Sequence, residues 1–350
     1  MINRQVIRTR VLQVAYAHLH KGEQKISASE ADLRTSLERS YDLYMYLLRL
    51  PVELTERIVE LQATRLRKHF RSEAAHLIDG RLAGNLYTAQ VERCQTLESW
   101  YNQFPLSWLD ADLLLRSLVD AIETSQIYKD YLASEPSYEA DRNFWVEVFA
   151  QIIAPSTELA EYLEEQSIYW DDELCYIEKI DCENHPGLDN EEILAAIKLS
   201  QESNAYQSQR YENGNVEIVK AFVLKSMKRA TAEEELDSVL LPAYRDEEDE
   251  TFALHLLRQT LVGYDKASEL IQRHLSAGWD KERLADMDEL LMHLAVTEFL
   301  HFPSIPTNIT INEYVELSKH YSTPKSSAFV NGVLDSIAKE LKAEGKILKK

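Results

Sequence analysis

The sequence predicts an all-α fold, and three observations lead to that prediction. Glycine and proline together account for only 18 of the 350 residues, whereas an average globular protein contains roughly 12% of the two. A chain so poor in turn-forming residues has little room for the many tight turns of a sandwich or a propeller. Apolar residues make up 45% of the chain, which is enough for a core, and they recur at helical spacing. We therefore expect one large or two smaller helical domains.

The first predicted helix covers residues 3–21. Asn3 is a suitable N-cap, and from Ile7 onwards apolar side chains recur on one face. Arg4 and Arg8 are four residues apart and therefore share a side of the helix. That side lies toward the apolar face, so both arginines are exposed to solvent only if the first turns extend past the core.

The middle of the chain is expected to be helical with breaks. A second helical region is expected over 27–70, divided into two helices at Pro51, because a proline inside a helix removes one hydrogen bond and clashes with the preceding turn. Four later stretches also have helical patterns: 106–135, 141–168, 190–208 and 215–231. The run at 233–250, in which nine of eighteen residues are acidic, is expected to be a solvated linker.

The last part of the chain has the clearest helical pattern. Residues 281–302 form an amphipathic helix that the turn at 303–306 ends, and residues 309–322 form a shorter one. Thr323 followed by Pro324 is a typical start signal for a helix. The final predicted helix is amphipathic and ends in lysines.

The charge of the chain is unevenly distributed. The formal net charge of −21 by itself argues against nucleic acid, since phosphate binding depends on Lys and Arg. However, residues 1–100 carry +3 and residues 301–350 carry +2, whereas residues 101–300 carry −26. The two mildly basic ends therefore remain compatible with an RNA partner, and the acidic middle would attract a basic protein.

Several classes of protein are not indicated by the sequence. No apolar stretch is long enough to span a membrane, and no signal-peptide pattern opens the chain, so we expect a cytoplasmic protein. The three cysteines are odd in number and form no CxxC pair, which favours free thiols over disulfides or zinc. No phosphate-binding glycine loop and no GxSxG or HExxH motif occurs. We predict a protein that is not an enzyme and needs no cofactor or metal.

Both ends of the chain carry a family resemblance. Residues 311–335, INEYVELSKHYSTPKSSAFVNGVLD, resemble the C-terminal signature of the NusB family of transcription antitermination factors. Near the N-terminus, Arg4, Arg8, Gln13 and Tyr16 resemble the arginine-bearing first helix of the family.

The resemblance implies a particular architecture. It implies a NusB-like helical bundle of two subdomains with a large helical insertion. We expect N-terminal NusB-like helices over 1–50, an acidic helical insertion and linker over 51–245, and a C-terminal NusB-like subdomain over 246–350.

The resemblance also implies a function. Members of the family bind the boxA element of ribosomal RNA leaders together with NusE, a small-subunit ribosomal protein, and the pair joins an antitermination complex on RNA polymerase. We therefore expect a factor that binds single-stranded boxA-like RNA and promotes rRNA transcription. One alternative is a helical protein-binding scaffold that kept the fold but lost RNA binding. Another is an enzyme, because the same fold occurs as the N-terminal domain of rRNA cytosine methyltransferases.

The family pattern assigns candidate RNA contacts of two kinds. Arginine forks suit phosphate oxygens, and aromatic rings suit unpaired bases. The implied RNA-binding residues are Arg4, Arg8, Arg10, Tyr16, Tyr321, Lys325, Ser326 and Phe329. The alternatives are ordinary surface charge for the arginines and core packing for the rings.

Two further expectations follow from the family pattern. Asp288 stands where the family has a carboxylate that meets NusE. Ahead of the FVNG stretch the better-known members have an acidic residue and then Ser-His-Lys, whereas this chain has Lys325-Ser326-Ser327-Ala328, so boxA itself is not assured as the RNA. Replacing Arg4 and Arg8 with alanine is expected to weaken RNA binding and leave helicity unchanged.

Overall fold

The computed structural model describes residues 2–21, 25–68, 80–170, 215–275, 284–322 and 326–347. Within these ranges the chain is helical and has no strand beyond an isolated bridge between Ile2 and Tyr244, which confirms the predicted all-α class. The described residues form two compact units. One unit is made of residues 39–170 and 216–243, and the other of residues 2–38 and 244–347.

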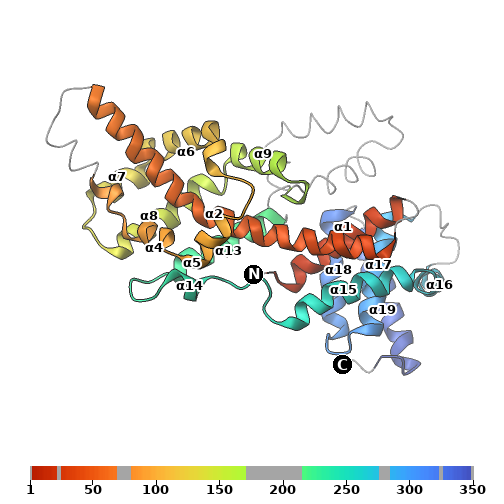
Figure 1. Ribbon diagram of the computed structural model, residues 1–350. Coiled ribbons are helices and arrows are strands. Elements are labelled where there is room, and N and C mark those ends of the chain that lie inside the picture. Colours follow the sequence, from red (N-terminus) through yellow and green to blue (C-terminus); the bar gives the residue numbers. More distant parts are fainter. Residues whose placement is uncertain are drawn as a thin grey trace. The chain divides into compact units, whose positions relative to one another are not determined.

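The unit that joins the two ends of the chain is a helical bundle (Figure 1). Its helices are α1 (Arg4–His20), the first part of α2 (Ile26–Lys68), α15 (Glu247–Val262), α16 (Tyr264–His274), α17 (Asp286–His301), α18 (Thr307–Tyr321) and α19 (Ser326–Ala343). Helix α17 packs against α1, α15, α16, α18 and α19, and almost all of its residues from Met287 to Phe299 are buried. A helix that is covered on all sides is the centre of its bundle.

Helix α1 begins as its sequence predicts. The side chain of Asn3 accepts a hydrogen bond of 2.9 Å from the backbone N–H of Val6, which satisfies one of the N–H groups left unpaired at a helix start. Ile7, Val11 and Leu12 are fully buried, so the apolar face packs against the bundle.

The second unit contains most of the predicted middle helices. Its elements are the rest of α2, α4 (Leu86–Glu92), α5 (Gln95–Tyr101), η1 (Trp108–Asp110), α6 (Asp112–Thr124), α7 (Gln126–Ala133), α8 (Tyr138–Val148), η2 (Phe149–Ile153), α9 (Thr157–Gln166), η3 (Ile168–Trp170), α13 (Asn215–Arg229) and α14 (Leu236–Val239). Stacked rings help to form its core: the ring of Tyr46 lies 3.8 Å from that of Trp108 and nearly parallel to it. The predicted helix over 215–231 is confirmed by α13.

The predicted break at Pro51 is wrong, because α2 continues through this residue. A proline inside a helix costs about 3 kcal/mol. The residues around it more than offset that cost by burial. Those buried neighbours are Leu47, Leu48, Leu50, Val52 and Leu54.

The predicted linker over 233–250 is only partly irregular. Residues 236–239 form α14 and residues 247–250 form the first turn of α15, while the remaining residues of the run are not helical. Asp246 caps α15 by accepting a hydrogen bond of 3.1 Å from the backbone N–H of Asp249. Acidic side chains are favoured at this end of a helix because the macrodipole is positive there.

Serines divide two of the predicted helices. Ser125 accepts a bond from the backbone N–H of Tyr128 and begins α7 within the predicted range 106–135. Ser156 caps α9 in the same way within 141–168. The predicted helix over 190–208 and the start signal at Thr323 and Pro324 lie outside the described residues.

Candidate nucleic-acid interface

Helix α1 carries four of the expected RNA contacts, three in its first half and one in its second half. Arg8 contacts Glu298 near the end of α17, whereas His20 contacts Asp286 at the start of α17. The two helices are therefore antiparallel. With a rise of 1.5 Å per residue, the first and last turns of α1 lie about 20 Å apart. We call the two regions the ion-pair end and the ring end.

The ion-pair end is organised by one buried carboxylate, that of Glu298. Arg8 donates to it twice, from Nε at 2.9 Å and from Nη2 at 2.8 Å, and donates from Nη1 to Glu313 at 3.0 Å. Glu298 is fully buried and also accepts hydrogen bonds from Thr310 Oγ1 at 2.8 Å and Tyr314 Oη at 3.2 Å. A bidentate arginine fork with further donors is the geometry that stabilises a buried charge pair.

The pKa directions agree with this geometry. Burial alone lowers the pKa of Arg8, but the hydrogen bonds and the charge of Glu298 outweigh burial and raise it. The pKa of Tyr314 is also raised, first by burial and then by the charge of Glu298. Arg8 thus stays charged, and Tyr314 stays protonated as a donor.

The structure therefore engages Arg8 inside the bundle. Its side chain is 4% exposed, and its fork holds Glu298 and Glu313. A contact of Arg8 with RNA phosphates stays a prediction, and removal of Arg8 would leave Glu298 buried without its partner, which is strongly destabilising.

The other two arginines of α1 are also engaged in the bundle. Arg4 is 28% exposed and donates from Nε to the buried Asp249 at 2.9 Å. Its guanidinium also lies over the ring of Phe252. Arg10 is buried and donates to Gln13 Oε1 at 3.0 Å, so its expected RNA contact stays a prediction.

The ring end lies at the other end of α1. Tyr16 is half-buried, and its ring stacks on that of His20 with centroids 4.0 Å apart and an interplanar angle of 27°. Tyr321 is buried and lies 3.2 Å from Gln13 Nε2, which donates to its hydroxyl. Tyr321 therefore packs in the bundle, contrary to the expectation of an open stacking surface, whereas Tyr16 is partly exposed.

The start of α19 completes the ring end. Ser326 donates to Asp288 Oδ2 at 2.7 Å and lies 3.0 Å from the hydroxyl of Ser322. Phe329 follows one turn later and is half-buried. Lys325 lies outside the described residues.

Asp288 connects α17 to α19 at this end. It is buried, and burial raises the pKa of its carboxyl although the hydrogen bonds from Ser326 and Ser322 lower it. The carboxylate expected to meet NusE thus lies inside the bundle, where it accepts a hydrogen bond from Ser326.

The ring end is defined by residues of α1 and of α17 to α19. Its members are Gln13, Tyr16, His20, Asp286, Asp288, Tyr321, Ser322, Ser326 and Phe329. Sequence reasoning did not select His20, although its spacing of four from Tyr16 is the one at which helical side chains meet. It gave no role to Glu298, because the arginine that pairs with it lies 290 residues away in the chain.

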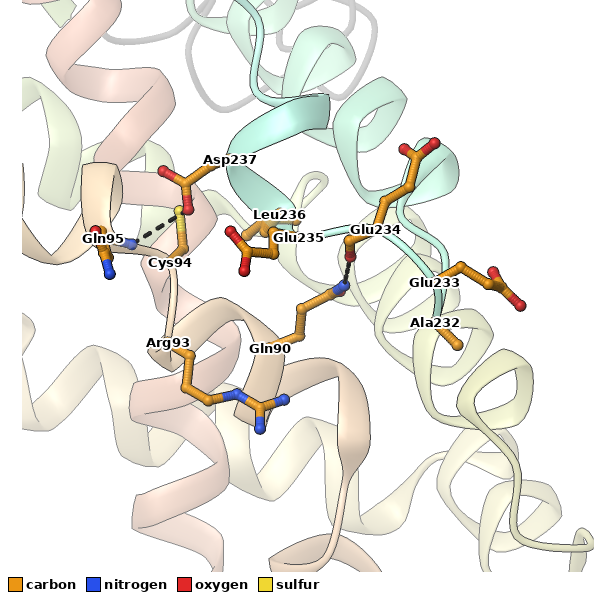
Figure 2. Close-up of a pocket in the computed structure, with 10 residues that line it drawn as sticks. All are labelled: Gln90, Arg93, Cys94, Gln95, Ala232, Glu233, Glu234, Glu235, Leu236 and Asp237. Carbon is orange, nitrogen blue, oxygen red and sulfur yellow. Dashed lines mark hydrogen bonds between the residues drawn. The ribbon is translucent and has the colours of Figure 1, made fainter.

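A pocket of about 350 Å³ lies in the other unit (Figure 2). Asp237 caps α5 there by accepting from the backbone N–H groups of Gln95 and Thr96 at 3.3 and 3.1 Å. Gln90 donates to the backbone carbonyl of Glu234 at 2.6 Å. Burial raises the pKa of Cys94 to about 11, so its thiol is protonated at neutral pH and is a weak nucleophile. These contacts hold the pocket wall together and present no activated group.

Two searches of the described residues bear on the class of protein. Among them, no group of three or more His, Cys, Asp or Glu side chains is placed to hold a metal ion. No helix in the described ranges is long and apolar enough to cross a membrane.

Comparison with known proteins identifies the family. The NusB family profile matches residues 215–339. The transcription antitermination protein NusB of Salinibacter ruber is 34% identical over 134 residues, which cover 38% of this chain and 83% of that relative. NusB of Bacillus licheniformis is 33% identical over 129 residues, covering 33% of this chain and 99% of the relative. The chain therefore belongs to the NusB family, and the resemblance seen in the sequence is confirmed.

A solved structure is also similar in sequence. NusB of T. maritima is 33% identical and covers 36% of this chain and 87% of its own, with a TM-score of 0.27. The matched portions amount to little more than a third of the 350 residues, so this chain is longer than these relatives.

Proposed function

We propose that this protein is an RNA-binding transcription antitermination factor. In this proposal it acts in the cytoplasm with NusE on single-stranded boxA-like RNA of rRNA leaders, within an antitermination complex on RNA polymerase. The observation that carries the proposal is membership of a family whose relatives are named transcription antitermination proteins. The ring end supports it, since the partly exposed rings of Tyr16 and His20 stack on each other there.

The bundle favours base stacking over phosphate pairing as the main source of affinity. The arginines of α1 are held by Asp249, Glu298 and Gln13, so little of their charge is available to phosphates. Tyr16 and Phe329 are partly exposed instead. A base stacked on an aromatic ring contributes about 1–3 kcal/mol. We therefore assign the RNA contacts to Tyr16 and Phe329, with Ser326 fixing the start of α19 that carries Phe329.

The acidic middle of the chain has a role in the same proposal. The predicted insertion over 51–245 lies largely within the −26 region. A field of that sign attracts a basic ribosomal protein and repels RNA, which directs RNA toward the basic ends. Binding of NusE to the chain should therefore weaken steeply with salt.

The test is binding of a fluorescently labelled boxA-like RNA to the full chain, with and without NusE, against a scrambled RNA of equal length. Preferential binding of the boxA-like RNA, strengthened by NusE, supports the proposal. Absence of RNA binding under both conditions rejects it. If NusE alone binds, the chain is the protein-binding scaffold that kept the fold without RNA.

A further inference from the structure

His20 is held in a defined position at the end of α1. Its Nδ1 lies 2.9 Å from the backbone carbonyl oxygen of Tyr16, and its Nε2 lies 3.3 Å from Oδ2 of Asp286 in α17. One face of its ring stacks on Tyr16. Both nitrogens and one face are therefore occupied, while 44% of the side chain is exposed.

The contacts of His20 lie along the edge of its ring. Its two nitrogens face the backbone carbonyl oxygen of Tyr16 and the carboxylate of Asp286, and both of these groups only accept hydrogen bonds. The edge of the ring is therefore engaged within the bundle.

The surface that remains on His20 is its second face. A flat ring stacked on tyrosine extends the tyrosine by one ring, and an unpaired base stacks on such a flat surface. A phosphate, in contrast, would have to displace Asp286 from Nε2 to form a hydrogen bond. The geometry thus suits a nucleobase better than a phosphate.

We propose that Tyr16 and His20 form a two-ring platform, and that an unpaired base of the RNA stacks on the outer face of the His20 ring. This inference rests on the proposed function and deepens it, because it adds a contact that the family pattern did not assign.

The experiment uses the full chain with NusE and a boxA-like RNA that carries 2-aminopurine at successive positions. Stacking quenches the fluorescence of this base, so one position should be quenched by the wild type. His20→Ala is expected to abolish that quenching and to weaken binding about tenfold. His20→Phe keeps a flat face, so it should retain the quenching and most of the affinity.

His255→Ala is the matched control. His255 lies in the same unit, beside His301 at the opposite end of α17 from Asp286, and its removal should change neither quenching nor affinity. If His20→Ala binds and quenches as the wild type does, the platform is refuted and the proposed function stands. If the wild type binds no RNA, the proposed function itself fails.

Discussion

The two ends of α1 show how one helix divides its residues between stability and binding. At the ion-pair end, three positive side chains lie near the core, and buried or partly buried carboxylates hold two of them. At the ring end, the side chains of Tyr16 and His20 stack on each other and are partly exposed. Both groups belong to the region that resembles the family, yet only the second presents a surface.

The physical reason for the difference is the partner that each end meets. Glu298 is fully buried near the end of α17, where a carboxylate is costly unless a cation and hydrogen-bond donors surround it. Arg8 supplies the cation. At the ring end α1 meets the start of α17 and the end of α18, where helix termini are closer to solvent. An arginine in a family motif is thus not by itself a nucleic-acid contact.

The largest expected effect is at the ion-pair end. Glu298→Ala leaves the charge of Arg8 buried without its partner, which should lower the free energy of unfolding by about 3–5 kcal/mol. Urea unfolding followed by circular dichroism measures the loss. In the double variant Arg8→Met with Glu298→Leu, apolar side chains replace both charges and most of the stability should return. If Glu298→Ala were as stable as the wild type, the buried ion pair would not contribute to stability as expected.

The next effect separates binding from stability. Tyr16→Ala removes the ring on which His20 stacks, so RNA affinity should fall about tenfold, in line with about 1–3 kcal/mol per stacked base. Its urea midpoint should change little, because Tyr16 is only half-buried. Fluorescence anisotropy of labelled RNA measures the affinity.

Arg4→Ala is the matched variant at the other end of α1. It removes the hydrogen bond to the buried Asp249 and should cost about 1–3 kcal/mol of stability. Its RNA affinity should stay within about twofold of the wild type, because stacking rather than phosphate pairing supplies the affinity. A large loss of affinity in this variant would mean that the ion-pair end contacts the RNA.

A smaller effect concerns the pH dependence of stability at the ring end. Burial raises the pKa of Asp288, so the folded chain binds its proton more tightly than the unfolded chain does. The stability that the folded chain gains from this tighter proton binding is present at acid pH and is lost as pH rises through the folded-state pKa. Asp288→Asn has no proton to lose and keeps an acceptor for Ser326. Relative to the wild type, it should be more stable at pH 7 than at pH 4.

The control for this comparison is Asp120→Asn, an exposed carboxylate on α6. Its difference from the wild type should be the same at both pH values. Thermal unfolding at pH 4 and pH 7 measures both variants. If Asp288→Asn lost stability relative to the wild type on going from pH 4 to pH 7, the sign of the shift would be wrong.

The smallest expected effect is the salt dependence of RNA binding. Each phosphate contact on single-stranded RNA contributes about −0.7 to the slope of log K against log salt. With stacking as the main term, the slope should be shallow, about −1.5 or less in magnitude. A slope several times steeper would mean that phosphate pairing dominates the affinity. The two ends of α1 would then not differ in RNA binding in the way proposed.

Local patterns in the sequence determined the helical class, the start of α1 at Asn3, the succession of helices α17 to α19 and the family resemblance. They did so because caps, breaks and 3.6-residue periodicity act within a few residues of each other. The same local rules failed at Pro51, where burial of the surrounding leucines outweighs the cost of the proline, and in the acidic run that begins α15.

Only the tertiary structure decided what the arginines and rings do. The helical wheel of α1 already turned Arg8 toward the apolar face, but whether that side met solvent or a carboxylate depended on Glu298, 290 residues away in the chain. The pairing of His20 with Asp286 spans a similar separation. Charge burial and ring stacking depend on which helices pack together, and that is settled by the whole bundle rather than by any one segment.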